Sequence, residues 1–66
     1  MSVVKVIEIL AQSEKSWEDA AQIAVTAASQ SVRNIKSLYI DGMQAMVEDN
    51  KIVEYRVNAK ISFVVE

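Results

Sequence analysis

Serine hydroxyls and carboxylates are the side chains of this chain that could take part in covalent or acid–base chemistry. The sequence contains no histidine and no cysteine. Its serines therefore lack the base that usually activates a hydroxyl nucleophile. The adjacent acidic pairs Glu18–Asp19 and Glu48–Asp49 do not face each other in either a helix or a strand, so neither forms a pair of cooperating carboxylates. We expect a protein that is not an enzyme.

The length of the chain bears on how it is stabilised. It has 66 residues, with no cysteine, no proline and a single glycine. A core of this size contributes little net stability, and small chains usually add disulfides, a metal or neighbouring subunits. Disulfides are excluded here, so we expect one domain over residues 1–66 that forms a homo-oligomer.

The charge and hydropathy of the chain exclude some partners. Seven basic residues stand against nine acidic ones, which argues against binding to nucleic acid. No apolar run approaches the roughly 20 residues of a membrane span, and Lys5 and Glu8 interrupt the apolar stretch that a signal peptide would need. We expect a cytoplasmic protein with neither nucleic-acid nor membrane partners.

Three segments have the patterns of strands. Residues 3–10 are β-branched and aliphatic on both faces, which predicts a strand covered on both sides, the second cover coming from another subunit. Residues 38–47 alternate less regularly, and residues 53–65 alternate apolar and polar throughout. The polar residues 48–51 predict a turn between the last two strands, in which Asn50 tolerates a positive φ.

One helix is expected between the first two strands, after a polar connection over residues 11–15. Ser16 is a suitable N-cap, and acidic residues follow it in the first turn. The apolar positions recur at helical spacing over residues 17–33, with Arg33 in the last turn. We interpret Trp17, the only tryptophan, as a core residue.

The order of these elements predicts an α+β fold of the β-α-β-β type. The last two strands form a hairpin, and the helical crossover favours parallel first and second strands. The third strand then lies between them, antiparallel to both. The prediction is a three-stranded sheet of order 1-3-2 that wraps one alanine-rich helix and leaves two open edges.

An ordered set of landmarks over nearly the whole chain resembles the dodecin family. The landmarks are the strand Lys5-Val6-Ile7-Glu8-Ile9, then Ser13, Trp17-Glu18 and Ala20, then Val32-Arg33, Tyr55, Val57 and Phe63. Dodecins are small β-α-β-β proteins that assemble as hollow shells of twelve subunits, and the best-known activity of the family is to bind and store flavins in stacked pairs. The resemblance therefore implies a homododecamer.

Three positions depart from the pattern of the flavin-binding members. The tryptophan that stacks on the flavin ring matches Ser37, the glutamine of strand three that bonds the flavin matches Arg56, and an arginine of strand two matches Gln44. Tyr39 lies two residues from Ser37 and offers a substitute ring on the same face. The resemblance thus marks Ser37, Gln44 and Arg56 as ligand-site positions and implies that the usual flavin stacking is lost.

A second branch of the family, the calcium dodecins, is more similar. Ser16-Trp17-Glu18 and Tyr55-Arg56-Val57 match its pattern. Calcium takes six to eight oxygen ligands, and one subunit lacks an Asp-x-Asp-x-Asp-Gly loop. A calcium site would therefore be weak, or would pool carboxylates from several subunits around a symmetry axis, with Asp41, Glu48, Asp49 and Glu54 as candidates.

The function expected from the sequence is binding and storage of a small ligand or a metal ion in a hollow dodecameric shell. Calcium is the metal ion that the resemblance suggests. Two alternatives stay open. One is a flavin-binding dodecin with a rebuilt site, and the other is a structural assembly protein without a specific ligand. Arg56 has two interpretations: a contact to a ligand or anion, or an ion pair between subunits with an acid such as Glu54, Asp41 or Glu48.

Overall fold

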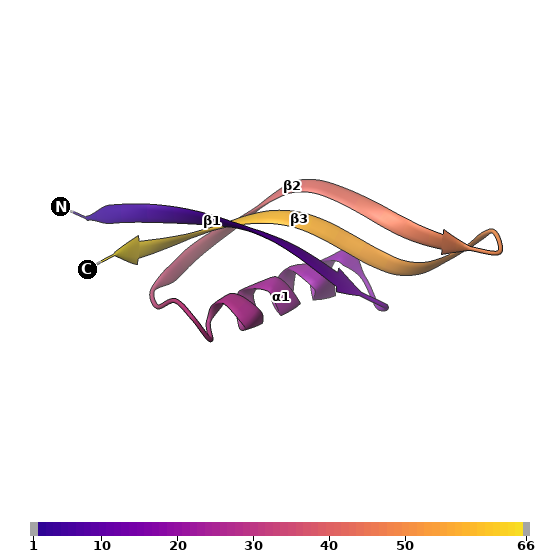
Figure 1. Cartoon of the computed structure of the whole chain (residues 1–66), viewed down its shortest axis with the longest axis horizontal. Coiled ribbons are helices and arrows are strands. Elements are labelled where there is room, and N and C mark those ends of the chain that lie inside the picture. Colours follow the sequence, from indigo (N-terminus) through magenta and orange to yellow (C-terminus); the bar gives the residue numbers. More distant parts are fainter. Residues whose placement is uncertain (1, 66) are drawn as a thin grey trace.

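A computed structural model describes residues 2–65 of the chain, so Met1 and Glu66 of the expected domain lie outside the described part. Strand β1 spans Val3–Ser13, helix α1 spans Trp17–Ala28, strand β2 spans Ile35–Glu48 and strand β3 spans Lys51–Val65. The sheet has the order β1-β3-β2, and β3 is antiparallel to both neighbours. Helix α1 packs on one face of this curved sheet (Figure 1). The predicted α+β fold is confirmed.

The core lies between α1 and the sheet. Ala20 and Ala24 of the helix have no exposed surface, and neither do Val57 and Ile61 of β3. Small alanine side chains let the helix approach the strands closely, which is why a short helix can form a closed interface with so small a sheet. Trp17 packs against this cluster, as expected.

The helix is shorter than predicted, because it ends at Ala28 and leaves Arg33 outside. The Ser29 hydroxyl donates to the Thr26 carbonyl at 2.7 Å, and the amides of Gln30 and Ser31 donate to carbonyls three residues back. Serine side chains compete with the helical backbone for hydrogen bonds, and the tighter final turn follows from that competition.

Strand β1 is longer than predicted. The polar segment after residue 10 was expected to be a connection, but Ala11 to Ser13 continue the ladder against β3 and end at the pair Ser13–Tyr55. Ala11 and Ser13 are buried beneath α1. Pairing with residues of β3 extends the strand to Ser13. These partners are distant in sequence, so the local pattern around residue 12 could not predict the extension.

Strands β2 and β3 continue past the end of β1 as a two-stranded projection, here called the hairpin arm and comprising residues 46–54 (Figure 1). Its turn is formed by Asp49 and Asn50, with φ values of 51° and 64°. Two successive positive φ values define a type I′ turn, whose twist suits a tight hairpin. The positive φ predicted for Asn50 is confirmed.

The irregular alternation of β2 also has a structural cause. The register of β2 against β3 shifts at three points, between Ile35 and Ser37, between Ile40 and Gly42, and between Met46 and Val47. Each irregularity changes which side chains of β2 lie on a given face of the sheet. The only helix of the described chain, α1, has 12 residues, and no helix of the described part is long and apolar enough to span a bilayer.

Candidate functional site on the open face of the sheet

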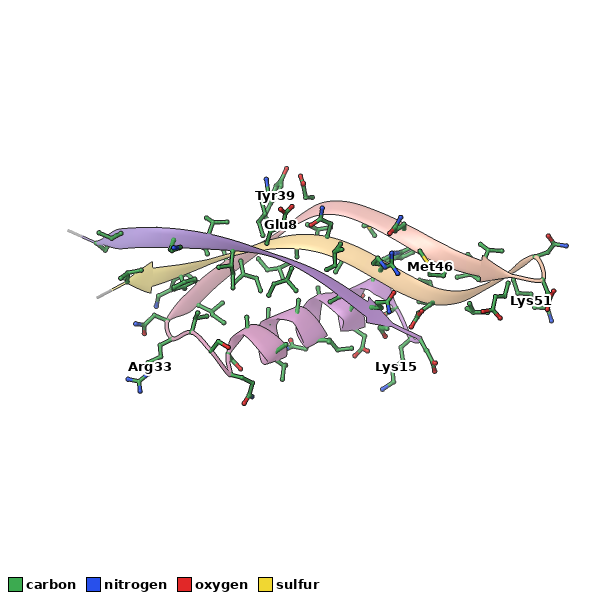
Figure 2. All side chains as sticks on the ribbon, viewed as in Figure 1. Glu8, Lys15, Arg33, Tyr39, Met46 and Lys51 are labelled. Carbon is green, nitrogen blue, oxygen red and sulfur yellow. The ribbon has the colours of Figure 1, made fainter. Side chains whose placement is uncertain are left out.

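The face of the sheet that points away from α1 is here called the open face. Along β3 it carries Glu54, Arg56, Asn58, Lys60 and Ser62, because the buried residues between them point toward the helix. Figure 2 shows Glu8 of β1 and Tyr39 of β2 projecting from this face as well. Both are cross-strand partners of Lys60. The open face is thus organised as rows of three residues, one from each strand.

One of these rows is built around Arg56, whose cross-strand partners are Gln12 of β1 and Gln44 of β2. The Gln12 carbonyl oxygen Oε1 accepts from Arg56 Nε at 2.9 Å and from Arg56 Nη2 at 2.6 Å. The Gln44 oxygen Oε1 accepts from Arg56 Nη1 at 3.2 Å. The guanidinium is therefore held by a neutral side-chain amide from each neighbouring strand.

This arrangement leaves the charge of Arg56 unneutralised within the subunit. Three of the five guanidinium N–H groups are used by Gln12 and Gln44, and two stay available. Among residues 2–65, no carboxylate pairs with Arg56. A preorganised arginine without an acidic partner is suited to receive an oxyanion in a bidentate manner.

The adjoining row has an unsatisfied acceptor. Asn58 lies between Leu10 and Gly42, and its side-chain oxygen Oδ1 is buried without a hydrogen-bond partner. A shallow hollow of about 240 Å³ opens here, lined by Leu10, Gly42, Met43, Gln44 and Asn58. A Cβ placed on Gly42 would meet nothing within 4 Å. A donor from water, a ligand or a neighbouring subunit would supply the missing hydrogen bond.

The structure brings two of the three predicted ligand-site positions together and separates the third. Gln44 and Arg56 are direct cross-strand partners, whereas Ser37 pairs with Ser62, and the two hydroxyl oxygens lie 2.5 Å apart. Ser62 lies six positions after Arg56 on β3, which corresponds to roughly 20 Å of strand. Ser37 and Arg56 of one subunit cannot contact the same small ligand. A site that uses all three positions would have to combine residues of different subunits, so their assignment as ligand residues stays a prediction.

The two aromatic residues considered at sequence level occupy different places. Tyr39 lies on the open face one row from Ser37 and is 64% exposed. Trp17 is the first residue of α1. Its Nε1 donates to the Gln44 carbonyl at 3.0 Å, and its ring packs edge to face on Tyr55 with the ring centroids 4.8 Å apart. Tyr39 is therefore the ring available on the open face near Ser37, and Trp17 fastens α1 to β2 and β3.

The four candidate calcium ligands do not gather in one subunit. Glu48 and Asp49 lie at the tip of the hairpin arm and Glu54 on its β3 strand, opposite Met46. Asp41 lies at the irregularity between Ile40 and Gly42, beyond the arm. No group of three or more acidic residues within the described part of the chain could hold a metal ion. Their role as metal ligands stays a prediction for the assembled protein.

Sequence reasoning missed Gln12 and Asn58. Asn58 was detectable, because strict alternation along β3 places it on the same face as Arg56. Gln12 lay in a segment interpreted as a connection, so its position beside Arg56 depended on a strand extension that no local pattern indicated.

The fold and this open face together define a class: small β-α-β-β proteins with one face of the sheet covered by a helix and the other face uncovered. A family model for dodecin matches residues 3–66. A curated relative, the calcium dodecin of Mycobacterium tuberculosis, is 38% identical over 63 residues, covering 96% of this chain and 89% of the relative. The chain belongs to the dodecin family.

Solved structures agree with this assignment. The dodecin of Streptomyces coelicolor superposes with a TM-score of 0.93 at 26% identity, covering 98% of this chain and 93% of the other. The calcium dodecin of Mycobacterium tuberculosis, described as a calcium-chelating antigen with a novel calcium-binding site, superposes with a TM-score of 0.84 at 35% identity, with the same coverage of both chains. The similarity to the calcium-dodecin branch agrees with the resemblance found in the sequence.

Proposed function

We propose that this chain is the subunit of a hollow dodecameric shell in the cytoplasm that binds and stores calcium and carries out no catalysis. The observation that carries the proposal is the 38% identity to a calcium dodecin over 96% of the chain. The dispersed carboxylates of a single subunit support a site completed by neighbouring subunits, because calcium needs six to eight oxygens.

The surface of the isolated subunit supports assembly. Val4, Val6 and Leu10 are each more than half exposed on the open face of β1. Val47 and Ile52 of the hairpin arm are also more than half exposed. A two-stranded hairpin is marginally stable in water without a packed face, and apolar exposure of this kind marks an interaction surface. Neighbouring copies would cover both regions.

The open face also argues against flavin stacking of the usual kind. Ser37 has no ring, and its hydroxyl is already engaged by Ser62. The exposed ring of Tyr39 favours one second candidate, a flavin bound by Tyr39 in place of tryptophan. Quenching of riboflavin fluorescence on titration with protein would support that candidate, and Tyr39→Leu should then abolish the quenching.

The test of the calcium proposal combines native mass spectrometry with calorimetric titration of Ca²⁺ into protein stripped with a chelator. We expect twelve subunits, heat of binding and a higher melting temperature with Ca²⁺. The double variant Glu48→Gln/Asp49→Asn should weaken binding at least tenfold. Glu14→Gln, which removes an exposed carboxylate outside the arm, is the matched control. Binding unchanged in the double variant would reject the arm carboxylates, and no heat with the intact protein would reject calcium.

A further inference from the structure

The two ends of the subunit differ in charge. The molecule measures 51 × 19 × 13 Å. The tip of the hairpin arm lies at one end of the long axis, and the start of β1 and the end of β3 lie at the other (Figure 1). The arm carries three acidic residues and one basic residue. The far end, here called the basic end and comprising residues 2–7, 29–37 and 61–65, carries three basic residues and no acidic one.

A hollow at the basic end combines apolar side chains with an unpaired cation. It has a volume of about 370 Å³, and its lining includes Val32, Arg33, Phe63 and Val65. In the described part of the chain Arg33 has no ion-pair partner, and Figure 2 shows its side chain projecting outward from this end. Lys5, the cross-strand partner of Phe63, adds a second cation. The hollow is therefore apolar inside and bordered by positive charge.

The tip of the hairpin arm has the complementary composition. Val47 and Ile52 are cross-strand partners, so they share one face of the arm, and they are 60% and 54% exposed. Glu48 and Asp49 follow at the turn, and among the described residues neither has an ion-pair partner. Two exposed aliphatic side chains beside two carboxylates match an apolar hollow bordered by cations.

We propose that the hairpin arm of one subunit inserts its tip into the hollow at the basic end of a second copy of the chain. Val47 and Ile52 would fill the hollow, and Glu48 would pair with Arg33 of the partner subunit. The inference rests on the proposed shell and names one contact that holds it together. Calcium can still bind at the arm, because a carboxylate has about four lone-pair positions and a single arginine does not occupy all of them.

The positions of the two surfaces on the molecule decide the kind of contact. They lie at opposite ends of an axis of 51 Å, so a subunit cannot insert its arm into its own hollow. A contact between two different patches is heterologous, and it produces a closed ring if the rotation closes and an open filament if it does not. A shell of finite size requires rings. Every subunit of a ring would then have its arm seated and its hollow filled.

A charge swap tests the pairing of Arg33 with Glu48. Arg33→Glu and Glu48→Lys should each raise the concentration at which subunits dissociate at least tenfold. Light scattering over a dilution series measures this, with a chelator present so that calcium does not bridge carboxylates. The combined Arg33→Glu/Glu48→Lys variant should assemble like the unmodified chain, because the pair is restored with its charges exchanged. Lys15→Glu makes the same change of charge on an exposed residue outside both surfaces and should have no effect.

The combined variant also separates the arm from another partner for Arg33. Glu66 follows Val65 in the sequence and could neutralise Arg33, but it would leave the hollow empty and the pair Val47–Ile52 uncovered. A substitution at residue 48 cannot restore a pair with residue 66. Failure of the combined variant to recover assembly would therefore overturn the pairing with the arm.

Engineered disulfides test the geometry, because the chain has no cysteine of its own. Ser31 lines the hollow, and Lys51 lies at the tip of the arm (Figure 2). Within one subunit these positions lie at opposite ends, whereas a disulfide needs Cα atoms within about 7 Å. Under mild oxidation the double variant Ser31→Cys/Lys51→Cys should form covalent species longer than a dimer, and a mixture of the two single variants should stop at dimers.

The outcomes distinguish the arm contact from the shell itself. A double cysteine variant that stays monomeric on a non-reducing gel, while native mass spectrometry shows an intact shell, would overturn the arm contact and leave the shell in place. An unmodified chain that is monomeric in native mass spectrometry would contradict both. Covalent rings that return to monomers on reduction would support the contact.

Discussion

Ser13 donates its hydroxyl hydrogen to Asp19 Oδ2 at 2.6 Å and joins the last residue of β1 to the first turn of α1. The same aspartate donates its backbone N–H to the hydroxyl of Ser16, the N-cap, at 3.0 Å. The Ser13 oxygen also accepts from the Lys15 amide at 2.9 Å. The side chain of Asp19 therefore holds the β1–α1 connection, and it does not reach back to the N-cap as an ordinary capping box would.

Removal of this carboxylate should destabilise the protein. Asp19→Ala leaves the buried Ser13 hydroxyl without its acceptor, and we expect the free energy of unfolding to fall by about 1–3 kcal/mol. Asp19→Asn keeps a carbonyl acceptor and should lose less. Denaturant unfolding at a fixed subunit concentration measures both, and equal stability of the three proteins would contradict this role.

The indole of Trp17 makes a polar and an apolar contact that can be separated by mutation. Trp17→Phe removes the 3.0 Å hydrogen bond to the Gln44 carbonyl but keeps a ring near Tyr55, and should cost about 0.5–1.5 kcal/mol. Trp17→Ala also removes the ring and should cost about 3–5 kcal/mol. Thermal unfolding followed by circular dichroism compares them, and a similar loss in both variants would mean that the hydrogen bond accounts for the whole effect.

The turn of the hairpin arm makes a prediction about backbone conformation. Asn50 has a φ of 64°, which a β-branched residue adopts only with strain. Asn50→Val should lower the free energy of unfolding by about 1–2 kcal/mol, whereas Asn50→Gly should be neutral or slightly stabilising. The two variants form a matched pair in chemical denaturation. Equal stability of both would show that the turn does not keep this conformation.

Apolar exposure on β1 predicts where assembly is sensitive. Val6 is 53% exposed on the open face of the subunit. If a neighbour covers it, Val6→Asp buries a charge and should raise the concentration at which subunits dissociate by at least tenfold. Light scattering over a dilution series measures this. Glu14→Gln, which alters an exposed residue beyond the end of β1, should leave the curve unchanged. A wild-type chain that is a stable monomer would contradict the proposed shell itself.

Much of the fold could be predicted because its signals are local. The alternation along β3 indicates which side chains face α1. Ser16 is the N-cap of the helix, and Asn50 adopts the positive φ that the hairpin turn requires. The end of α1 was missed, since Ser29 interrupts a helical pattern through a hydrogen bond from its hydroxyl to the Thr26 carbonyl. Local pattern therefore predicted the elements and their inner faces better than their ends.

The candidate site was likewise predictable from the sequence only in part. Alternation along a strand has a period of two, so the sequence by itself determined that Arg56 shares a face with Asn58, and that Ser37 shares one with Tyr39. Which residues meet across strands depends on register and on bulges, and these are settled by packing between segments distant in sequence. Only the tertiary structure placed Gln12 against Arg56 and set Ser37 apart from it. The face on which a side chain lies is set by the alternation of its own strand, whereas its neighbours across the sheet are set by how the strands pair.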